Sequence, residues 1–120
     1  MTLFEYCLLA HLVGDYLVQT EFEAMNKALG KFWNRGLVAH CLKYTACFVL
    51  PFLSFGVNLW WLLPVYATHM VFDRRWPIVL WRKYVNHNTD ESIAKTFWLT
   101  IMTDQIFHIL VIAIIAGCAL

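Results

Sequence analysis

Residues 2–20, TLFEYCLLAHLVGDYLVQT, decide the fold that the rest of the chain must adopt. This apolar run is close to the roughly 20 residues that a helix needs to cross a bilayer core. It nevertheless carries His11 and Asp15, four residues apart. A histidine and an aspartate at the same spacing recur in two later apolar segments. The pattern predicts membrane helices that enclose a polar centre.

The composition also indicates an integral membrane protein. Hydrophobic residues make up 61% of the 120 residues and aromatic residues 17%, and the mean hydropathy is +0.60. Soluble domains are apolar at about half of their residues, whereas here long apolar blocks alternate with only short polar pieces. We expect a single domain, residues 1–120, whose main partner is the lipid bilayer.

We expect an all-α transmembrane bundle with four spans, because each apolar block is near the length that a bilayer core requires. After the first span, Thr20 and Glu23 form a T-x-x-E capping box, which predicts a short interfacial helix that ends near Gly30. Pro77 is expected to bend or loosen the last turns of the third span. The predicted spans cover residues 2–20, 35–55, 59–82 and 97–119.

Basic residues are concentrated in two connecting segments, 21–35 and 74–95. The turn between the second and third spans and both ends of the chain hold almost none. By the positive-inside rule the two basic loops face the cytoplasm. Both termini are therefore expected on the non-cytoplasmic side of a bacterial inner membrane. The formal net charge is only +1, so we expect no nucleic-acid binding.

The three His/Asp pairs agree with this up-and-down arrangement. In the first and third spans, which run toward the cytoplasm, the histidine precedes the aspartate. In the fourth span, which runs the other way, Asp104 precedes His108. Four helical residues rise by about 6 Å, so each histidine should lie one turn deeper than its aspartate. We expect the pairs and His40 of the second span to meet in the cytoplasmic half of the bundle.

A shared cation would compensate for the burial of these ionisable side chains. One aspartate at the centre of a span costs about 2.5–3.5 kcal/mol on insertion scales, although a single histidine could simply hydrogen-bond a neighbouring helix. Imidazole and carboxylate ligands together suit Zn²⁺, Mn²⁺ or Fe²⁺. Seven candidates exceed the four ligands of one tetrahedral site, so some support the ligands or two metals bind. The expected metal ligands are His11, Asp15, His40, His69, Asp73, Asp104 and His108.

Other polar residues near this layer allow more than one interpretation. Gly14 could let two helices approach closely, and Gln105 could hydrogen-bond a ligand or reach a lipid headgroup. Lys43 could contact a phosphate, pair with an aspartate, or extend to the membrane interface. Arg74 and Arg75 could bind a lipid phosphate or form only a basic membrane boundary.

Two metal ions would make hydrolysis chemically reasonable, because paired ions activate water and stabilise the leaving oxygen. We therefore interpret the chain as a metal-dependent hydrolase that acts at the cytoplasmic leaflet on a phosphate-containing or lipid-linked substrate. Asp15 and Asp104 are the candidate catalytic bases. Two alternatives stay open. One is a non-enzymatic bacterial or phage membrane protein that binds a partner or perturbs the envelope, and the other is a homo-oligomer that conducts cations or protons.

Several of these segments resemble a known family. They are AHLVGDYLVQT from Ala10, His40, THMVFD from Thr68 and DQIFH from Asp104, and together they are similar to the landmarks of a small bacterial and phage membrane family, domain of unknown function 3307. The resemblance covers nearly the whole chain and implies a helical protein with several membrane spans, without implying an activity. One departure is the Arg-Arg-Trp sequence after Asp73, where a single basic residue is expected.

Overall fold

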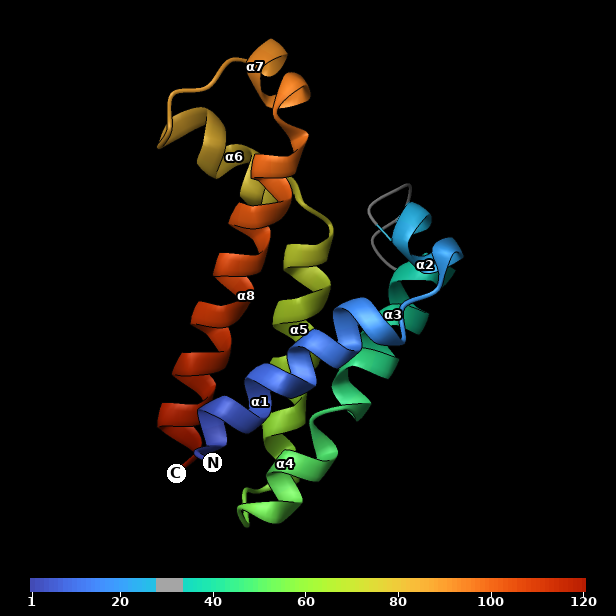
Figure 1. Ribbon diagram of the computed structural model, residues 1–120, viewed down its shortest axis with the longest axis vertical. Coiled ribbons are helices and arrows are strands. Elements are labelled where there is room, and N and C mark those ends of the chain that lie inside the picture. The colour runs from blue at the N-terminus through green and yellow to red at the C-terminus, as the bar shows by residue number, and fades with distance from the viewer. Residues whose placement is uncertain (28–33) are drawn as a thin grey trace.

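Helices form all the regular secondary structure in the part of the chain that the structure, a computed structural model, describes: residues 1–27 and 34–120 (Figure 1). The predicted all-α class is confirmed. The elements are α1 (Leu3–Leu12), the π-helical turn η1 (Val13–Leu17), α2 (Glu21–Asn26), α3 (Arg35–Ala46), α4 (Val49–Ser54), the 3-10 turn η2 (Leu59–Trp61), α5 (Leu62–Asp73), α6 (Trp76–Tyr84), α7 (Asp90–Lys95) and α8 (Phe97–Ala119).

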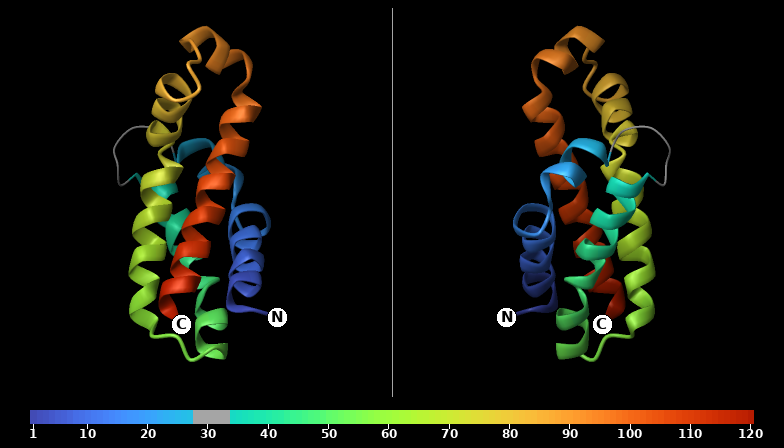
Figure 2. Two further views of the ribbon diagram at one scale, coloured as in Figure 1. Left: turned by 90° about the vertical axis from the view of Figure 1, so that its left-hand side faces the viewer. Right: turned by 90° about the vertical axis from the view of Figure 1, so that its right-hand side faces the viewer.

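The helix α5 lies between α3 and α8 and packs against both. The helix α1 packs against α8, and the turn η1 reaches α3. Figure 2 shows these helices side by side, with α6 and α7 beyond one end of the bundle and α4 at the other. Both termini lie at the α4 end, which is the arrangement that an even number of passes through the bundle produces.

Prolines decide where two of the helices stop. A proline ring clashes with the carbonyl group four residues earlier, which belongs to Asp73 for Pro77 and to Cys47 for Pro51. Accordingly, α5 ends at Asp73, and α6 starts at Trp76 with Pro77 in its first turn. Likewise, α3 gives way to α4 after Cys47. The bend expected in the third span is therefore a complete break between two helices.

The residue Arg75 carries the chain through this break. Its φ angle is 69°, in the left-handed region, which disfavours residues with a Cβ by roughly 1–2 kcal/mol. Its N–H group donates a hydrogen bond to the carbonyl of Phe72 at 2.9 Å. The chain thus turns immediately after Asp73, and this carboxylate lies on the C-terminal residue of α5.

The capping box predicted at Thr20 is present. The hydroxyl of Thr20 accepts a hydrogen bond from the N–H of Glu23 at 3.2 Å, and the Glu23 carboxylate accepts one from the N–H of Thr20 at 3.1 Å. The other carboxylate oxygen of Glu23 lies 2.8 Å from Nζ of Lys43. Burial opposes the ionisation of Glu23, but these partners outweigh it and hold the pKa of this carboxyl below its ordinary value. The helix ends at Asn26, and the predicted end near Gly30 lies outside the described residues.

The described bundle exposes many large apolar side chains and buries several ionisable ones beside its apolar core. Large apolar side chains are exposed on its outside, among them Leu63 at 60% and Ile114 at 65%, while His40 and Asp73 are 0% and 1% exposed. Ionisable residues are rarely buried to this degree in soluble proteins unless they are paired.

Two described segments, Arg35–Ser54 and Phe97–Ala119, are long and apolar enough to cross a membrane. They correspond to the second and fourth of the predicted spans. The other two spans, residues 2–20 and 59–82, stay predictions. The third is divided by the break after Asp73, and the first consists of α1 and η1.

The turn η1 brings the first helical segment close to α3. The N–H of Val18 donates to the carbonyl of Val13 at 3.1 Å, which is the five-residue spacing of a π-helix. A Cβ on Gly14 would lie 2.7 Å from Cδ2 of Tyr44 and 3.2 Å from its Cα. The expectation that Gly14 permits a close helix approach is confirmed.

Replacing Gly14 with alanine should destabilise the fold. The added methyl group would meet the backbone of Tyr44 as well as its ring, so the two segments must separate, at a cost of about 1–3 kcal/mol for overpacking. Thermal unfolding of the purified protein in detergent, followed by circular dichroism, would measure the effect. The matched control is Gly117→Ala in α8, where a Cβ meets no atom within 4 Å. Equal melting temperatures for Gly14→Ala and the unaltered protein would contradict this account.

Candidate metal centre

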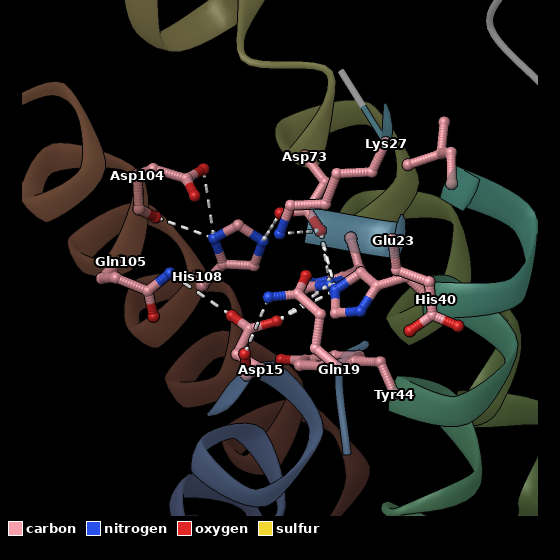
Figure 3. A network of polar contacts seen from close by, with 12 residues as sticks. Asp15, Gln19, Glu23, Lys27, His40, Tyr44, Asp73, Asp104, Gln105 and His108 are labelled. Carbon is pink, nitrogen blue, oxygen red and sulfur yellow. Dashed lines mark hydrogen bonds and ion pairs between the residues drawn. The ribbon is translucent and has the colours of Figure 1, made fainter. Parts of the chain in front are cut away.

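Six of the seven predicted metal ligands lie close together in the bundle, and Figure 3 labels all of them except His69. Their ligand atoms form two groups, and within each group all the atoms lie within 4.8 Å of one another. One residue belongs to both groups, so the two potential sites are adjacent. The first group is Asp15 of η1, His40 of α3, and His69 and Asp73 of α5; the second is Asp73, Asp104 and His108, the last two from α8.

The first group has nearly the dimensions of a tetrahedral metal site. The Nε2 atoms of His40 and His69 are 2.8 Å apart, and they lie 3.1 and 3.3 Å from Oδ1 of Asp15. Four ligand atoms at about 2.0–2.1 Å from a zinc ion would be separated by roughly 3.3 Å. A small outward movement of these side chains would therefore make room for one ion. A cation among these atoms would satisfy the electron pairs of both imidazole nitrogens and of the carboxylate at once.

The carboxylate of Asp73 faces both groups. Its Oδ2 lies 2.9 Å from Nε2 of His40 and 3.0 Å from Nε2 of His69, whereas its Oδ1 lies 3.4 Å from Nε2 of His108. One carboxylate oxygen is thus directed at each potential site. If metal ions were bound, Asp73 could therefore serve as a ligand in both groups.

The ring of His108 is oriented by its own helix. Its Nδ1 lies 2.8 Å from the main-chain carbonyl of Asp104, and because a carbonyl can only accept, Nδ1 carries the proton. The lone pair of Nε2 is then directed toward Asp73, as a neutral imidazole ligand requires. The carboxylate of Asp104 lies on the other side of the ring, with its Oδ1 3.3 Å from Nδ1.

Several ligand atoms of the second group are buried without a hydrogen-bond partner among the described residues. They are Oδ1 of Asp73, Oδ1 of Asp104 and Nε2 of His108. Their residues are 1%, 4% and 3% exposed. A buried polar atom without a partner costs about 1–3 kcal/mol, and all three of these atoms are electron-pair donors. A cation would satisfy them together.

The remaining predicted ligand, His11, lies beside the two groups. Its Nε2 lies 2.8 Å from the amide oxygen of Gln105, to which it donates, and its Nδ1 accepts from the Tyr44 hydroxyl at 2.7 Å. Both ring nitrogens are therefore engaged by protein groups. Gln105 in turn donates to Oδ2 of Asp15 at 3.3 Å, so of the two roles considered for Gln105 the structure favours a hydrogen bond to a candidate ligand. His11 and Gln105 together help to orient Asp15.

The side chain of Tyr44, which the sequence patterns did not single out, orients a second ligand. Its ring is stacked on that of His69, with centroids 3.5 Å apart and an interplanar angle of 7°. The Nδ1 atoms of His40 and His69 have no hydrogen-bond partner among the described side chains and backbone, so packing against Tyr44 sets the plane of His69. The four-residue spacing from His40 to Tyr44 was the available signal, because it places both on one helix face.

Two lysines occupy different positions around the centre. Lys27 is 7% exposed, and its Nζ lies 3.1 Å from Oδ2 of Asp73. Sequence reasoning had assigned this lysine only to a basic loop. Lys43 lies farther out, where it pairs with Glu23 and donates to the carbonyl of Val18 at 2.9 Å. Of the roles considered for Lys43, the structure therefore favours pairing with an acidic residue, although the partner is a glutamate of α2.

A cavity of about 220 Å³ opens beside the two ligand groups. Asp15 and Asp104, one from each group, form part of its wall, and Lys27 and Arg75 form another part. A molecule in this cavity would therefore reach the proposed ligands and two cationic side chains at once.

Comparisons with known proteins identify a family and no individual relative. No curated protein and no solved structure matches the chain. The model of a family described as "Protein of unknown function (DUF3307)" matches residues 3–120. This match takes in α1 through α8 and every residue of both ligand groups. The chain therefore belongs to the DUF3307 family.

Proposed function

We propose that this protein is a membrane-embedded metal enzyme that binds two divalent transition-metal ions and hydrolyses a phosphate-containing, lipid-linked substrate at the cytoplasmic leaflet. The observation that carries the proposal is the placement of Asp73, whose two carboxylate oxygens face two different ligand groups. Paired metal ions in hydrolytic enzymes are typically about 3.5–4 Å apart. A single bridging carboxylate suits that separation.

The donor atoms favour Zn²⁺, Mn²⁺ or Fe²⁺. The first group combines the imidazoles of His40 and His69 with two carboxylates. The second group combines the imidazole of His108 with two carboxylates. Mixed nitrogen and oxygen ligands suit these ions better than Ca²⁺ or Mg²⁺, which prefer oxygen alone.

Charge balance supports the binding of cations. Asp15, Asp73 and Asp104 are all buried, and Lys27 is the basic side chain that pairs with one of them. With neutral histidines, these four residues leave two uncompensated negative charges. One divalent ion would balance them, and a second would make the centre positive. A positive centre would attract an anionic substrate such as a phosphate ester.

The outer surface supports residence in a membrane. Apolar side chains cover the outside of the long helices, and two segments are long enough to cross a bilayer. The basic residues Arg74, Arg75, Arg82 and Lys83 all belong to the connection between α5 and α7. This distribution favours four spans in a bacterial inner membrane, with the connection from the end of α6 to α7 on the cytoplasmic side and both termini opposite.

The cavity beside the centre supports a hydrolytic role. Bound metal ions would lower the pKa of water and stabilise negative charge on the leaving oxygen. Asp104 borders the cavity, and its Oδ1 has no hydrogen-bond partner among the described residues. We assign Asp104 as the base that takes a proton from the attacking water while the water oxygen bonds to phosphorus. The bond from phosphorus to the leaving oxygen breaks, and that oxygen receives the proton. Asp15, the other candidate base, has hydrogen-bond partners at both carboxylate oxygens, His40 and Gln105, whereas Oδ1 of Asp104 has none among the described residues.

Metal content tests the centre directly. Protein purified in detergent without chelator should contain between one and two equivalents of a transition metal by elemental mass spectrometry. His69→Ala and the isosteric Asp73→Asn should both lower this content, because each removes a ligand of the first group. His87→Asn is the matched control, since His87 is exposed and has a left-handed φ of 57° that asparagine tolerates.

The same samples should respond to chelation. A ligand present at about 100 times its dissociation constant stabilises a fold by about 2.7 kcal/mol, so a chelator should lower the melting temperature of the unaltered protein. The shift should be much smaller in Asp73→Asn. Protein that contains almost no transition metal and melts at the same temperature with and without chelator would refute the metal centre.

Hydrolysis is tested with p-nitrophenyl phosphate and bis(p-nitrophenyl) phosphate as probes of the metal-loaded protein. We expect a metal-dependent release of p-nitrophenol. The rate of release should fall about 100-fold or more in Asp104→Asn, since general acid–base catalysis contributes about 10²–10⁴-fold. Asp104→Asn should retain the metal of the first group, which lacks Asp104. Retained hydrolysis in this variant would contradict the assignment. A metal-loaded protein that hydrolyses neither probe would instead favour a structural metal.

The orientation is tested with reporter fusions. A reporter that is active only in the periplasm, fused after Leu120, should be active, and the same reporter inserted at Asn88, between α6 and α7, should be silent. The expectation follows from the basic residues on the α6 and α7 side. The reverse pattern would overturn the orientation, and activity at both points would overturn the crossing by α8.

A further inference from the structure

The cavity beside the metal centre combines acidic, amide and basic side chains. Asp15 and Asp104 border it on the side of the metal centre, Lys27 and Arg75 contribute the positive charges, and Gln105 contributes an amide. Lys27 is already paired with Asp73 at 3.1 Å. Arg75 is therefore the cationic group that remains available to a bound molecule.

The guanidinium of Arg75 has no acidic partner in the structure. Among residues 1–27 and 34–120 it forms no ion pair, and its recorded contact is with the ring face of Phe97, 5.2 Å from the ring centroid. Arg75 also adopts the left-handed backbone conformation at the break between α5 and α6. Strained conformations of this kind cluster at functional sites. The contact with the ring of Phe97 uses the face of the guanidinium and leaves its charge without an acidic partner among the described residues.

A second observation points to a ligand in the same cavity. Oδ1 of Asp104 is buried and has no hydrogen-bond partner among the described groups, although its residue borders the cavity. Asp104 and Arg75 therefore contribute opposite charges to the lining of one cavity, and no ion pair joins them. A bound group that carries anionic oxygens for Arg75 and lies next to metal ions held by Asp104 would satisfy both.

We infer that this cavity binds the phosphate group of the substrate and that Arg75 recognises it. The inference rests on the proposed metal centre, because the ions would contact the same phosphate. A guanidinium offers two parallel N–H groups to two phosphate oxygens, which makes arginine a specific partner for this anion. Lys27 adds a point charge on the same side.

The size of the cavity limits what enters it. Its volume of about 220 Å³ is below the roughly 300–1,000 Å³ of pockets that enclose a drug-sized ligand. A phosphate group fits, while the rest of a larger molecule must lie outside. Tyr16 and Ile101, which line the cavity, are 60% and 37% exposed on the outside of the bundle. This open, largely apolar side favours a phosphate carried by a membrane lipid over a free phosphate compound.

Binding of inorganic phosphate tests Arg75. We would titrate phosphate into the metal-loaded protein in detergent, follow the heat of binding, and measure the metal content of every sample. Arg75→Gly should weaken phosphate binding by about 10- to 100-fold, or about 1.4–2.8 kcal/mol. Its metal content should not change. Glycine suits the positive φ of residue 75, so this variant should melt at or above the temperature of the unaltered protein.

Two further variants make the test specific. Arg75→Lys keeps the charge but loses the paired N–H groups, so its affinity for phosphate should lie between those of the arginine and glycine forms. Lys83→Gln removes one positive charge from the exposed pair with Asp90 and should not change the affinity. Unchanged phosphate affinity in metal-loaded Arg75→Gly would overturn the inference and leave the metal centre intact. Absence of metal from the unaltered protein would overturn the metal centre itself.

The source of the phosphate is tested with lipid nanodiscs. Metal-loaded protein in phosphatidylcholine nanodiscs that contain a minor fraction of phosphatidic acid should retain phosphatidic acid selectively in native mass spectrometry. Arg75→Gly should lose this selectivity, while Lys83→Gln should keep it. Phosphate binding in detergent together with no selectivity for phosphatidic acid would overturn the lipid source and favour a soluble phosphate ester.

Discussion

The burial of the Asp73 carboxylate inside an apolar bundle is the constraint on which the rest of the structure depends. A carboxylate that is 1% exposed must be surrounded by groups that compensate its charge. His40 approaches it from α3, Lys27 from the end of α2, and His108 from α8. The helices α2, α3 and α8 are thus each held in place partly by a polar contact with Asp73 of α5. The apolar contacts near the α4 end of the bundle do not need such precise placement.

Much of this arrangement could be predicted from the sequence because it depends on short-range regularity. A histidine and an aspartate four residues apart share one helix face, so the pairs on α5 and α8 were expected to face a common centre. The capping box at Thr20 depends only on local chemistry and was also predicted. The contribution of His40 followed from its depth in an apolar segment. These features need no knowledge of how distant parts of the chain pack.

The features that were missed depend on backbone geometry or on long-range contacts. His11 and Asp15 were expected to act together, and Nδ1 of His11 does lie 3.7 Å from Oδ2 of Asp15. Both ring nitrogens of His11 nevertheless have closer partners, Tyr44 and Gln105, and these belong to other helices, so no local pattern indicated them. The position of Lys27 depends on how α2 folds back toward α5. No local sequence pattern indicates that the chain folds back in this way. From the sequence, Lys27 was therefore only one of the basic residues that indicate which side of the membrane the loop faces.

The break after Asp73 has a further consequence for the electrostatics of the centre. The carbonyl groups in the last turn of a helix lack partners within it, and the aligned peptide dipoles place about half a negative charge at that end. Because Pro77 stops α5 at Asp73, the negative pole of α5 lies at the level of the ligand groups. If the helix continued, this pole would lie several turns away. A proline four residues beyond an aspartate therefore makes the backbone of α5, as well as its side chains, attractive to cations.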